Sequence, residues 1–205
     1  MAGALSEYHR GVAATNRAAL LEAATALFLD QGYDRTSLAR VAAAAGVSKA
    51  TLFKQFPTKA ALFEAVVLAA GGAADGDIPD PPGDDFIAGL TEIGLAYAAL
   101  LERPRIVALM RTIIAESPRF SELGERTFDF GTLPAIRALH RFFVRQRALG
   151  AATVDDVEAA AAQYLGMIAT VVFWPRLVHG GWTLTPDEVE RVVREAAATM
   201  AARYA

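Results

Sequence analysis

Residues 38–56 read LARVAAAAGVSKATLFKQF, and this stretch decides the fold. Apolar residues up to Ala42 complete one face of a short helix, and Gly46 follows four residues later. A sharp turn at that point needs a positive φ, which glycine adopts without a steric penalty from a Cβ atom. Leu52 and Phe56 then form the apolar face of a second short helix. The spacing predicts two helices that cross closely at a steep angle, which is a helix-turn-helix.

The second of these helices has an outer face suited to DNA. With Leu52 and Phe56 turned inward, the helical period exposes the following side chains: Ala50, Thr51, Lys54 and Gln55. Lys49 lies in the first turn, at the end that usually enters the major groove. Short side chains allow close approach, a hydroxyl and an amide can read base edges, and lysines suit phosphates. The alternative is an ordinary packed helix pair with a solvated basic face.

Residues beside this face are candidates for phosphate contacts. Lys59 lies in the first turn of the next helix, where its charge combines with free backbone amides. Arg40 and the hydroxyls of Thr36 and Ser37 lie on the flank and suit the same role.

The charge distribution supports a polyanionic partner for one end of the chain. Residues 1–60 hold seven of the 20 Lys and Arg and four of the 23 Asp and Glu, a balance of +3. The remaining residues therefore hold thirteen and nineteen, a balance of −6. A basic head on an acidic body is typical of a protein that binds a polyanion with one end. A solvated charged surface is the alternative.

The rest of the chain predicts an all-α protein of about nine helices, with a three-helix DNA-binding head and a helical-bundle body. The first helix is capped by Thr15 or Asn16 and ends at Gly32, which accepts a left-handed conformation. In the body, helices are expected over residues 85–101, 104–115, 119–130, 133–149, 153–179 and 186–204. The last begins with a capping box formed by Thr185 and Glu188.

Residues 71–85 are rich in Gly, Pro and Asp and predict a linker. The boundary between head and body lies near it. We assign residues 1–60 to the DNA-binding domain and residues 61–205 to a regulatory domain for ligand binding and dimerisation.

Three segments of the head resemble the DNA-binding domain of the TetR family. They are residues 32–37 (GYDRTS), 41–53 (VAAAAGVSKATLF) and 56–63 (FPTKAALF), in the family's order and spacing. More weakly, residues 116–120 (ESPRF) and 163–167 (QYLGM) resemble the AefR-like type of TetR body. The resemblance implies a repressor that binds a palindromic operator as a homodimer and is released by a small-molecule inducer, without a cofactor.

Carried over position by position, the resemblance assigns base reading to Lys49, Ala50, Thr51 and Phe53. It assigns phosphate contacts to Ser37, Lys54, Gln55 and Lys59. The chain departs from the family at two positions. Phe53 replaces the usual tyrosine and loses a hydroxyl that can bond a phosphate, and Ala60 replaces a frequent glutamate.

The helices over 153–179 and 186–204 are expected to pair across the two-fold axis of the dimer. The first is rich in small residues, which allow backbones to approach closely, and the second carries an unbroken apolar stripe: Val189, Val192, Val193, Ala196, Ala197 and Met200. The alternative is that both stripes face the core of their own domain.

Large apolar residues in the body are candidates to line the pocket of a largely apolar inducer. The apolar candidates are Tyr97, Met110, Ile114, Phe128, Phe142, Met167 and Trp174, and core packing is the alternative for each of them. Gln163 and Tyr164 are candidate polar anchors, and a surface position or an internal hydrogen bond is the alternative for both.

The sequence argues against an enzyme and against a metal site. It has no cysteine, no Glu-x-x-His pair, no Gly-x-Ser-x-Gly motif, and three histidines without ligand spacing. A structural DNA-bending protein is disfavoured by the net charge of −3. The lack of a long apolar run and of a signal peptide predicts a cytoplasmic protein that does not enter a membrane.

Overall fold

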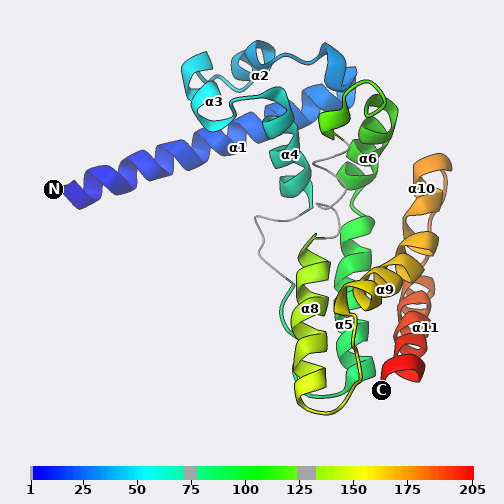
Figure 1. Ribbon diagram of the computed structural model, residues 1–205. Coiled ribbons are helices and arrows are strands. Elements are labelled where there is room, and N and C mark those ends of the chain that lie inside the picture. The colour runs from blue at the N-terminus through cyan, green and yellow to red at the C-terminus, as the bar shows by residue number, and fades with distance from the viewer. Residues whose placement is uncertain (1, 72–77, 124–132) are drawn as a thin grey trace. The chain divides into compact units, whose positions relative to one another are not determined.

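The computed structural model describes residues 2–71, 78–123 and 133–205, and all regular elements in these ranges are helices (Figure 1). The predicted all-α fold is therefore confirmed. Backbone contacts divide the chain into two compact units, residues 1–69 with 109–128 and residues 70–108 with 129–205. The boundary that we placed after residue 60 separates the chain by function and stays a prediction.

The first unit contains the helix-turn-helix. Its elements are α1 (Ala2–Arg35), α2 (Leu38–Ala44), α3 (Lys49–Gln55), α4 (Lys59–Ala70) and the second half of α6 (Pro104–Glu116). The long α1 runs beneath α2 and α3 in Figure 1. Its buried stripe of Leu20, Ala24 and Phe28 packs in a core with Phe63 of α4, whose ring centroid lies 4.9 Å from that of Phe28.

The start of α1 differs from the prediction. Thr15 and Asn16 do not cap it, because the helix begins at Ala2 and the Thr15 hydroxyl donates to the Gly11 carbonyl at 3.0 Å within it. The predicted break at Gly32 is confirmed by its φ of 80°, but a further turn follows it and α1 ends at Arg35. A Cβ atom at Gly32 would come within 2.8 Å of the Glu116 carboxylate, but this is the far end of a flexible side chain that can move, so the positive φ is what requires glycine here.

One described segment, Gly11–Arg35, is long and apolar enough to cross a membrane, contrary to the expectation that no such run exists. The segment meets the criteria for a membrane span by its length and composition only. In the structure, Leu20, Ala24 and Phe28 of the same segment are buried in the core of the first unit, although only 22% of its apolar window is buried.

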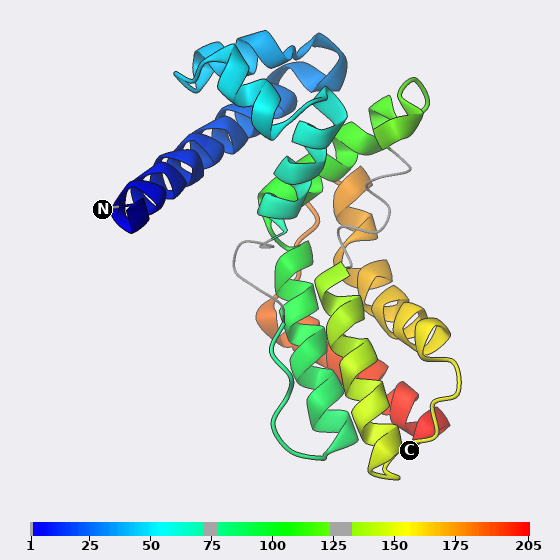
Figure 2. The ribbon, with the colours of Figure 1, turned by 60° about the vertical axis from the view of Figure 1, so that its left-hand side comes forward.

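The second unit is a helical bundle around α5. It contains α5 (Phe86–Leu101), the start of α6, α8 (Leu133–Ala148), α9 (Val157–Val172), α10 (Trp174–Val178) and α11 (Pro186–Tyr204). Helix α5 packs against α8, α9 and α11 (Figure 2). The predicted capping box of α11 is confirmed, because Thr185 accepts from the Glu188 amide and the Glu188 carboxylate accepts from the Thr185 amide.

The helix expected over residues 153–179 is two helices. Residues 153–156 lie outside α9, since the Thr153 amide donates to the Tyr204 carbonyl at 2.6 Å and Asp156 caps the helix start. The second break falls at Phe173, whose φ of −112° interrupts the helix. Pro175 has no amide hydrogen to continue the ladder and lies in the first turn of α10.

The linker prediction concerns residues 71–85, of which residues 72–77 lie outside the described ranges. Residues 78–85 form no helix and are held by two arginines of α8. Arg141 donates to the Asp80 carboxylate at 2.8 Å, and Arg145 donates to the Pro81 carbonyl at 2.9 Å. The helix predicted over residues 119–130 falls largely outside the described ranges.

Candidate nucleic-acid interface

Two serines begin the helices of the helix-turn-helix. Ser37 accepts from the Arg40 amide at 3.3 Å and caps α2, and Ser48 accepts from the Thr51 amide at 3.1 Å and caps α3. Between the helices, Gly46 has the predicted positive φ, at 66°. Serine caps satisfy backbone donors that a short helix leaves free. They therefore fix where α3 begins and which of its side chains face outward.

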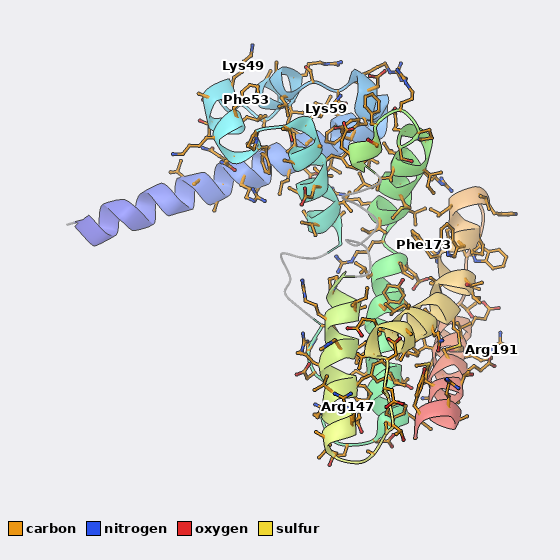
Figure 3. All side chains as sticks on the ribbon, in the orientation of Figure 1. Lys49, Phe53, Lys59, Arg147, Phe173 and Arg191 are labelled. Atoms are coloured by element: carbon orange, nitrogen blue, oxygen red, sulfur yellow. The ribbon has the colours of Figure 1, made fainter. Side chains whose placement is uncertain are left out.

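Helix α3 presents an exposed face with two cations and an aromatic ring. Leu52 and Phe56 are buried, as predicted, while the opposite face exposes Lys49, Ala50, Phe53 and Lys54. Figure 3 shows Lys49 on this helix, pointing away from α1. Phe53 is 49% exposed. The exposed face of α3 thus combines an apolar ring with the two cations of Lys49 and Lys54.

The remaining predicted residues of α3 are half-buried. The Thr51 hydroxyl lies 2.9 Å from that of Ser48, and Gln55 lies in the last turn. On the flank, Ser37 and Arg40 are exposed. Thr36 is not accessible to a phosphate, because its buried hydroxyl donates to the carbonyls of Leu27 and Gly32 at 3.2 and 2.9 Å.

Lys59 lies in a different environment from the other predicted phosphate contacts. Its amine donates to the carbonyls of Tyr33 and Asp34 at 2.8 and 3.1 Å. Partial burial lowers the pKa of Lys59, while the carboxylates of Asp34, Glu116 and Glu122 oppose that change. The structure thus places this cation against the end of α1.

Arg17 is a residue of this unit that the sequence reasoning missed. Its guanidinium lies over the ring of Phe56, 4.7 Å from the centroid. Phe56 is the C-cap residue of α3, so Arg17 braces the end of that helix from α1. The signal was present in the spacing, because Arg17 precedes Leu20, Ala24 and Phe28 on the same helical stripe.

Three of the predicted pocket residues are buried in the bundle. Phe142 packs its ring 5.7 Å from that of Phe86. Burial raises the pKa of Tyr97 to about 12. The Tyr164 hydroxyl donates to the Leu90 carbonyl at 2.6 Å, and burial raises the pKa of this phenol further still.

The other pocket candidates have varied surroundings. Ile114 and Trp174 are exposed, at 50% and 57%, and Gln163 is exposed with its side-chain oxygen 3.4 Å from the Tyr204 hydroxyl. Met110 and Met167 are half-buried, and Phe128 lies outside the described residues. A surface depression of about 520 Å³ elsewhere contains none of the candidates. It is lined by Asp85, Ile87, Ala88, Thr91, Glu92, Leu95 and Arg194.

Helices α9 and α11 use much of their apolar surface inside the bundle. Five of the six residues of the predicted α11 stripe are buried in the protomer: Val189, Val193, Ala196, Ala197 and Met200. The outer face of α9 remains exposed and carries Ala162, Gly166 and Thr170 at helical spacing, followed by Val171 and Trp174.

A capped helix-turn-helix with an exposed basic face, joined to a helical bundle, defines the chain as a helix-turn-helix DNA-binding regulator. It belongs to the TetR family of bacterial transcriptional regulators. Residues 20–66 match the model of the bacterial regulatory proteins of the tetR family, and residues 88–205 match that of the C-terminal domain of the AefR-like transcriptional repressor. Members of this family are soluble DNA-binding regulators that dimerise, and they are not generally enzymes.

Solved structures agree with this membership. A putative TetR-family regulator from Mesorhizobium loti is 26% identical, with 94% of this chain and 98% of that one covered and a TM-score of 0.78. The flavonoid-responsive regulator FrrA is 30% identical, with 92% and 96% covered and a TM-score of 0.75. A TetR-family regulator from Pseudomonas syringae pv. tomato is 25% identical, with 92% and 96% covered and a TM-score of 0.71. Comparison with curated proteins finds no match.

Proposed function

We propose that the protein is a cytoplasmic repressor that binds a palindromic operator as a homodimer and leaves it when a small molecule binds. The exposed face of α3 carries this proposal, because it sets Lys49, Phe53 and Lys54 outward on a serine-capped helix. Lys49, Ala50, Thr51 and Phe53 read bases. Ser37, Arg40, Lys54 and Gln55 hold the phosphate backbone and fix the register.

Selection of bound sequences from a random DNA pool tests this function. A two-fold dimer with one α3 in each half-site should select a palindrome whose half-site centres lie about one DNA turn apart, roughly 34–36 Å. Binding should weaken steeply as salt rises, because each phosphate contact releases a condensed counterion. Enrichment of no sequence, or of one without two-fold symmetry, would contradict the proposal.

For the dimer, we propose the exposed face of α9 as the contact surface, together with the outer face of α11. Gly166 supports this assignment. It lies inside a helix, where glycine costs about 0.5–1 kcal/mol relative to alanine. Within the protomer, no atom lies within 4 Å of a Cβ placed at this position. The protomer therefore gives no reason for a glycine here, whereas a second helix crossing at this point does.

Replacing Gly166 by alanine should weaken the dimer while leaving the folded protomer at least as stable. Two added methyl groups in a packed contact should raise the dimer dissociation constant roughly tenfold or more. Sedimentation equilibrium measures that constant, and chemical denaturation measures the protomer. Gly11→Ala is the matched control, since that helical glycine in α1 also has no atom within 4 Å of an added Cβ. A dimer of unchanged strength would exclude this part of α9 from the interface.

We propose a planar, largely apolar aromatic molecule as the inducer. The similar structure named a flavonoid-responsive regulator supports this class. Three aromatic pocket candidates that are buried in the bundle, Tyr97, Phe142 and Tyr164, also support it. A panel of flavonoids and simpler phenols, titrated against the complex with the selected operator, tests the idea. If none of these aromatic compounds released the protein from the operator and an aliphatic ligand did, the aromatic class would be rejected.

The proposed release mechanism is a shift between two populations of the dimer. In one form of the dimer, the two α3 helices are no longer separated by one DNA turn. An inducer that binds this form more tightly shifts the dimer toward it and away from DNA. The size of the shift is limited by the ratio of the inducer's affinities for the two forms. Crystal structures with and without inducer should differ in the distance between the two α3 helices. Equal distances would contradict this mechanism.

A further inference from the structure

Lys59 is embedded in a cluster that joins three distant parts of the first unit. Its amine reaches the carbonyls of Tyr33 and Asp34, at the end of α1, from the first turn of α4. The Tyr33 carbonyl also accepts from the Thr36 amide at 3.3 Å, and both carbonyls belong to the short turn that follows the break at Gly32. The lysine ammonium therefore holds this turn against the start of α4 through two hydrogen bonds.

Aromatic rings complete the surroundings of this amine. It lies 4.3 Å from the ring centroid of Tyr33 and 5.7 Å from that of Phe120. The two rings meet each other edge to face, with centroids 5.1 Å apart. Cations are attracted to the faces of aromatic rings, most strongly where water is partly excluded. Phe120 thereby brings a segment more than fifty residues away in sequence against the helix-turn-helix.

The same segment makes polar contacts with the end of α1. Arg119 pairs with Asp34 at 3.3 Å, and the Tyr33 hydroxyl lies 3.4 Å from the Glu122 carboxylate. The Glu116 carboxylate lies 2.8 Å from the position that a Cβ atom at Gly32 would take. Residues 109–128 accordingly group with the helix-turn-helix unit and not with the bundle.

These contacts disfavour Lys59 as a phosphate ligand. Two of the three hydrogens of its ammonium are used on backbone carbonyls. Three carboxylates near the amine would repel a phosphate brought to the same place: those of Asp34, Glu116 and Glu122. Lys54 differs, because it is exposed on α3.

We propose that residues 116–122 complete the DNA-binding unit and that Lys59 is a positioning residue, which holds the end of α1 and the start of α4 against Phe120. Thr36, directly after this end of α1, donates its hydroxyl to the Gly32 carbonyl, and Ser37 then caps α2. The position of the whole helix-turn-helix therefore follows from how the end of α1 is held. This inference rests on the proposed function and deepens it.

The test compares Lys59→Met with Lys54→Met in full-length protein, on the operator found by selection, over a range of salt concentrations. Loss of a phosphate contact in each copy should lower the slope of log K against log salt by about 0.9 per copy, roughly 2 per dimer. We expect that change for Lys54→Met. Lys59→Met should keep the wild-type slope and weaken binding by between about twofold and thirtyfold at every salt concentration.

Phe120→Ala is a second test variant. It removes no charge, and a phenylalanine ring cannot pair with a phosphate, so any loss of DNA affinity must come from the position of the helix-turn-helix. It should weaken binding to a similar degree, and the Lys59→Met/Phe120→Ala double variant should be weaker than wild type by clearly less than the product of the two single effects. A slope for Lys59→Met that falls like that of Lys54→Met would overturn the proposal. So would wild-type affinity in Phe120→Ala.

A measurement without DNA separates this inference from the proposed function. Amide hydrogen exchange at residues 33–37 should be faster in both Lys59→Met and Phe120→Ala than in wild type, while residues of α9 are unchanged. If the wild-type protein selected no DNA sequence, the proposed function would fail and exchange alone would decide the inference. Unchanged exchange at residues 33–37 in both variants would overturn it.

Discussion

Replacing Lys49 and Thr51 together by alanine is expected to lower the affinity of the dimer for its operator by about a thousandfold. Each change removes a contact from both copies of α3, so four contacts are lost. At about 1 kcal/mol for each contact, the total is about 4 kcal/mol, or three orders of magnitude in the dissociation constant. Titration of the labelled operator at fixed salt measures the effect.

The fold should survive this double substitution. Ser48 caps α3 through the Thr51 backbone amide, which alanine retains, and Lys49 is exposed. The melting temperature should therefore stay close to that of the wild type. Arg147→Ala is the matched control, because it removes an exposed cation from α8, in the other unit (Figure 3). Affinity within a factor of a few of wild type in the double variant would show that α3 does not read the operator.

The turn region of the DNA-binding unit was predictable because its constraints are local. The glycine at position 46, the serines before each helix, and the apolar residues at 52 and 56 act over a few residues. The spacing of the glycine and of the two apolar residues therefore predicted the turn and the exposed face of α3. The capping box of α11 was predictable for the same reason.

The role of Lys59 was not predictable by such reasoning. A lysine in the first turn of a helix suits a phosphate as long as its surroundings are unknown. Here those surroundings come from the end of α1 and from residues 116–122, and their proximity depends on how the chain folds back. The α11 stripe was ambiguous for a related reason, since an apolar helix face does not reveal whether its partner is its own bundle or a second copy.

Gly94→Ala is expected to lower the free energy of unfolding of the bundle by about 1–3 kcal/mol. In an exposed helix, the same change would stabilise by about 1 kcal/mol. At Gly94, however, an added Cβ would overlap the Tyr164 hydroxyl and would lie 2.7 Å from Val193 and 3.1 Å from Ile168. Helices α9 and α11 would have to move away from α5. Urea denaturation followed by circular dichroism measures the loss.

A double-substitution cycle with Tyr164→Phe separates steric overlap from other causes. Tyr164→Phe alone should cost about 1 kcal/mol, because it leaves the buried Leu90 carbonyl without this donor. Removing the hydroxyl also vacates part of the space that a Cβ at Gly94 needs. The double variant should therefore be more stable than the sum of the two single effects predicts. Additive losses would mean that the hydroxyl does not limit the space, and a stabilised Gly94→Ala would mean that α5 and α9 are not in close contact. Tyr164 is also a pocket candidate. If the losses in stability of the two single variants simply add, the Tyr164 hydroxyl is free to turn toward a ligand. If they are strongly coupled, the hydroxyl is held where α5 and α9 cross.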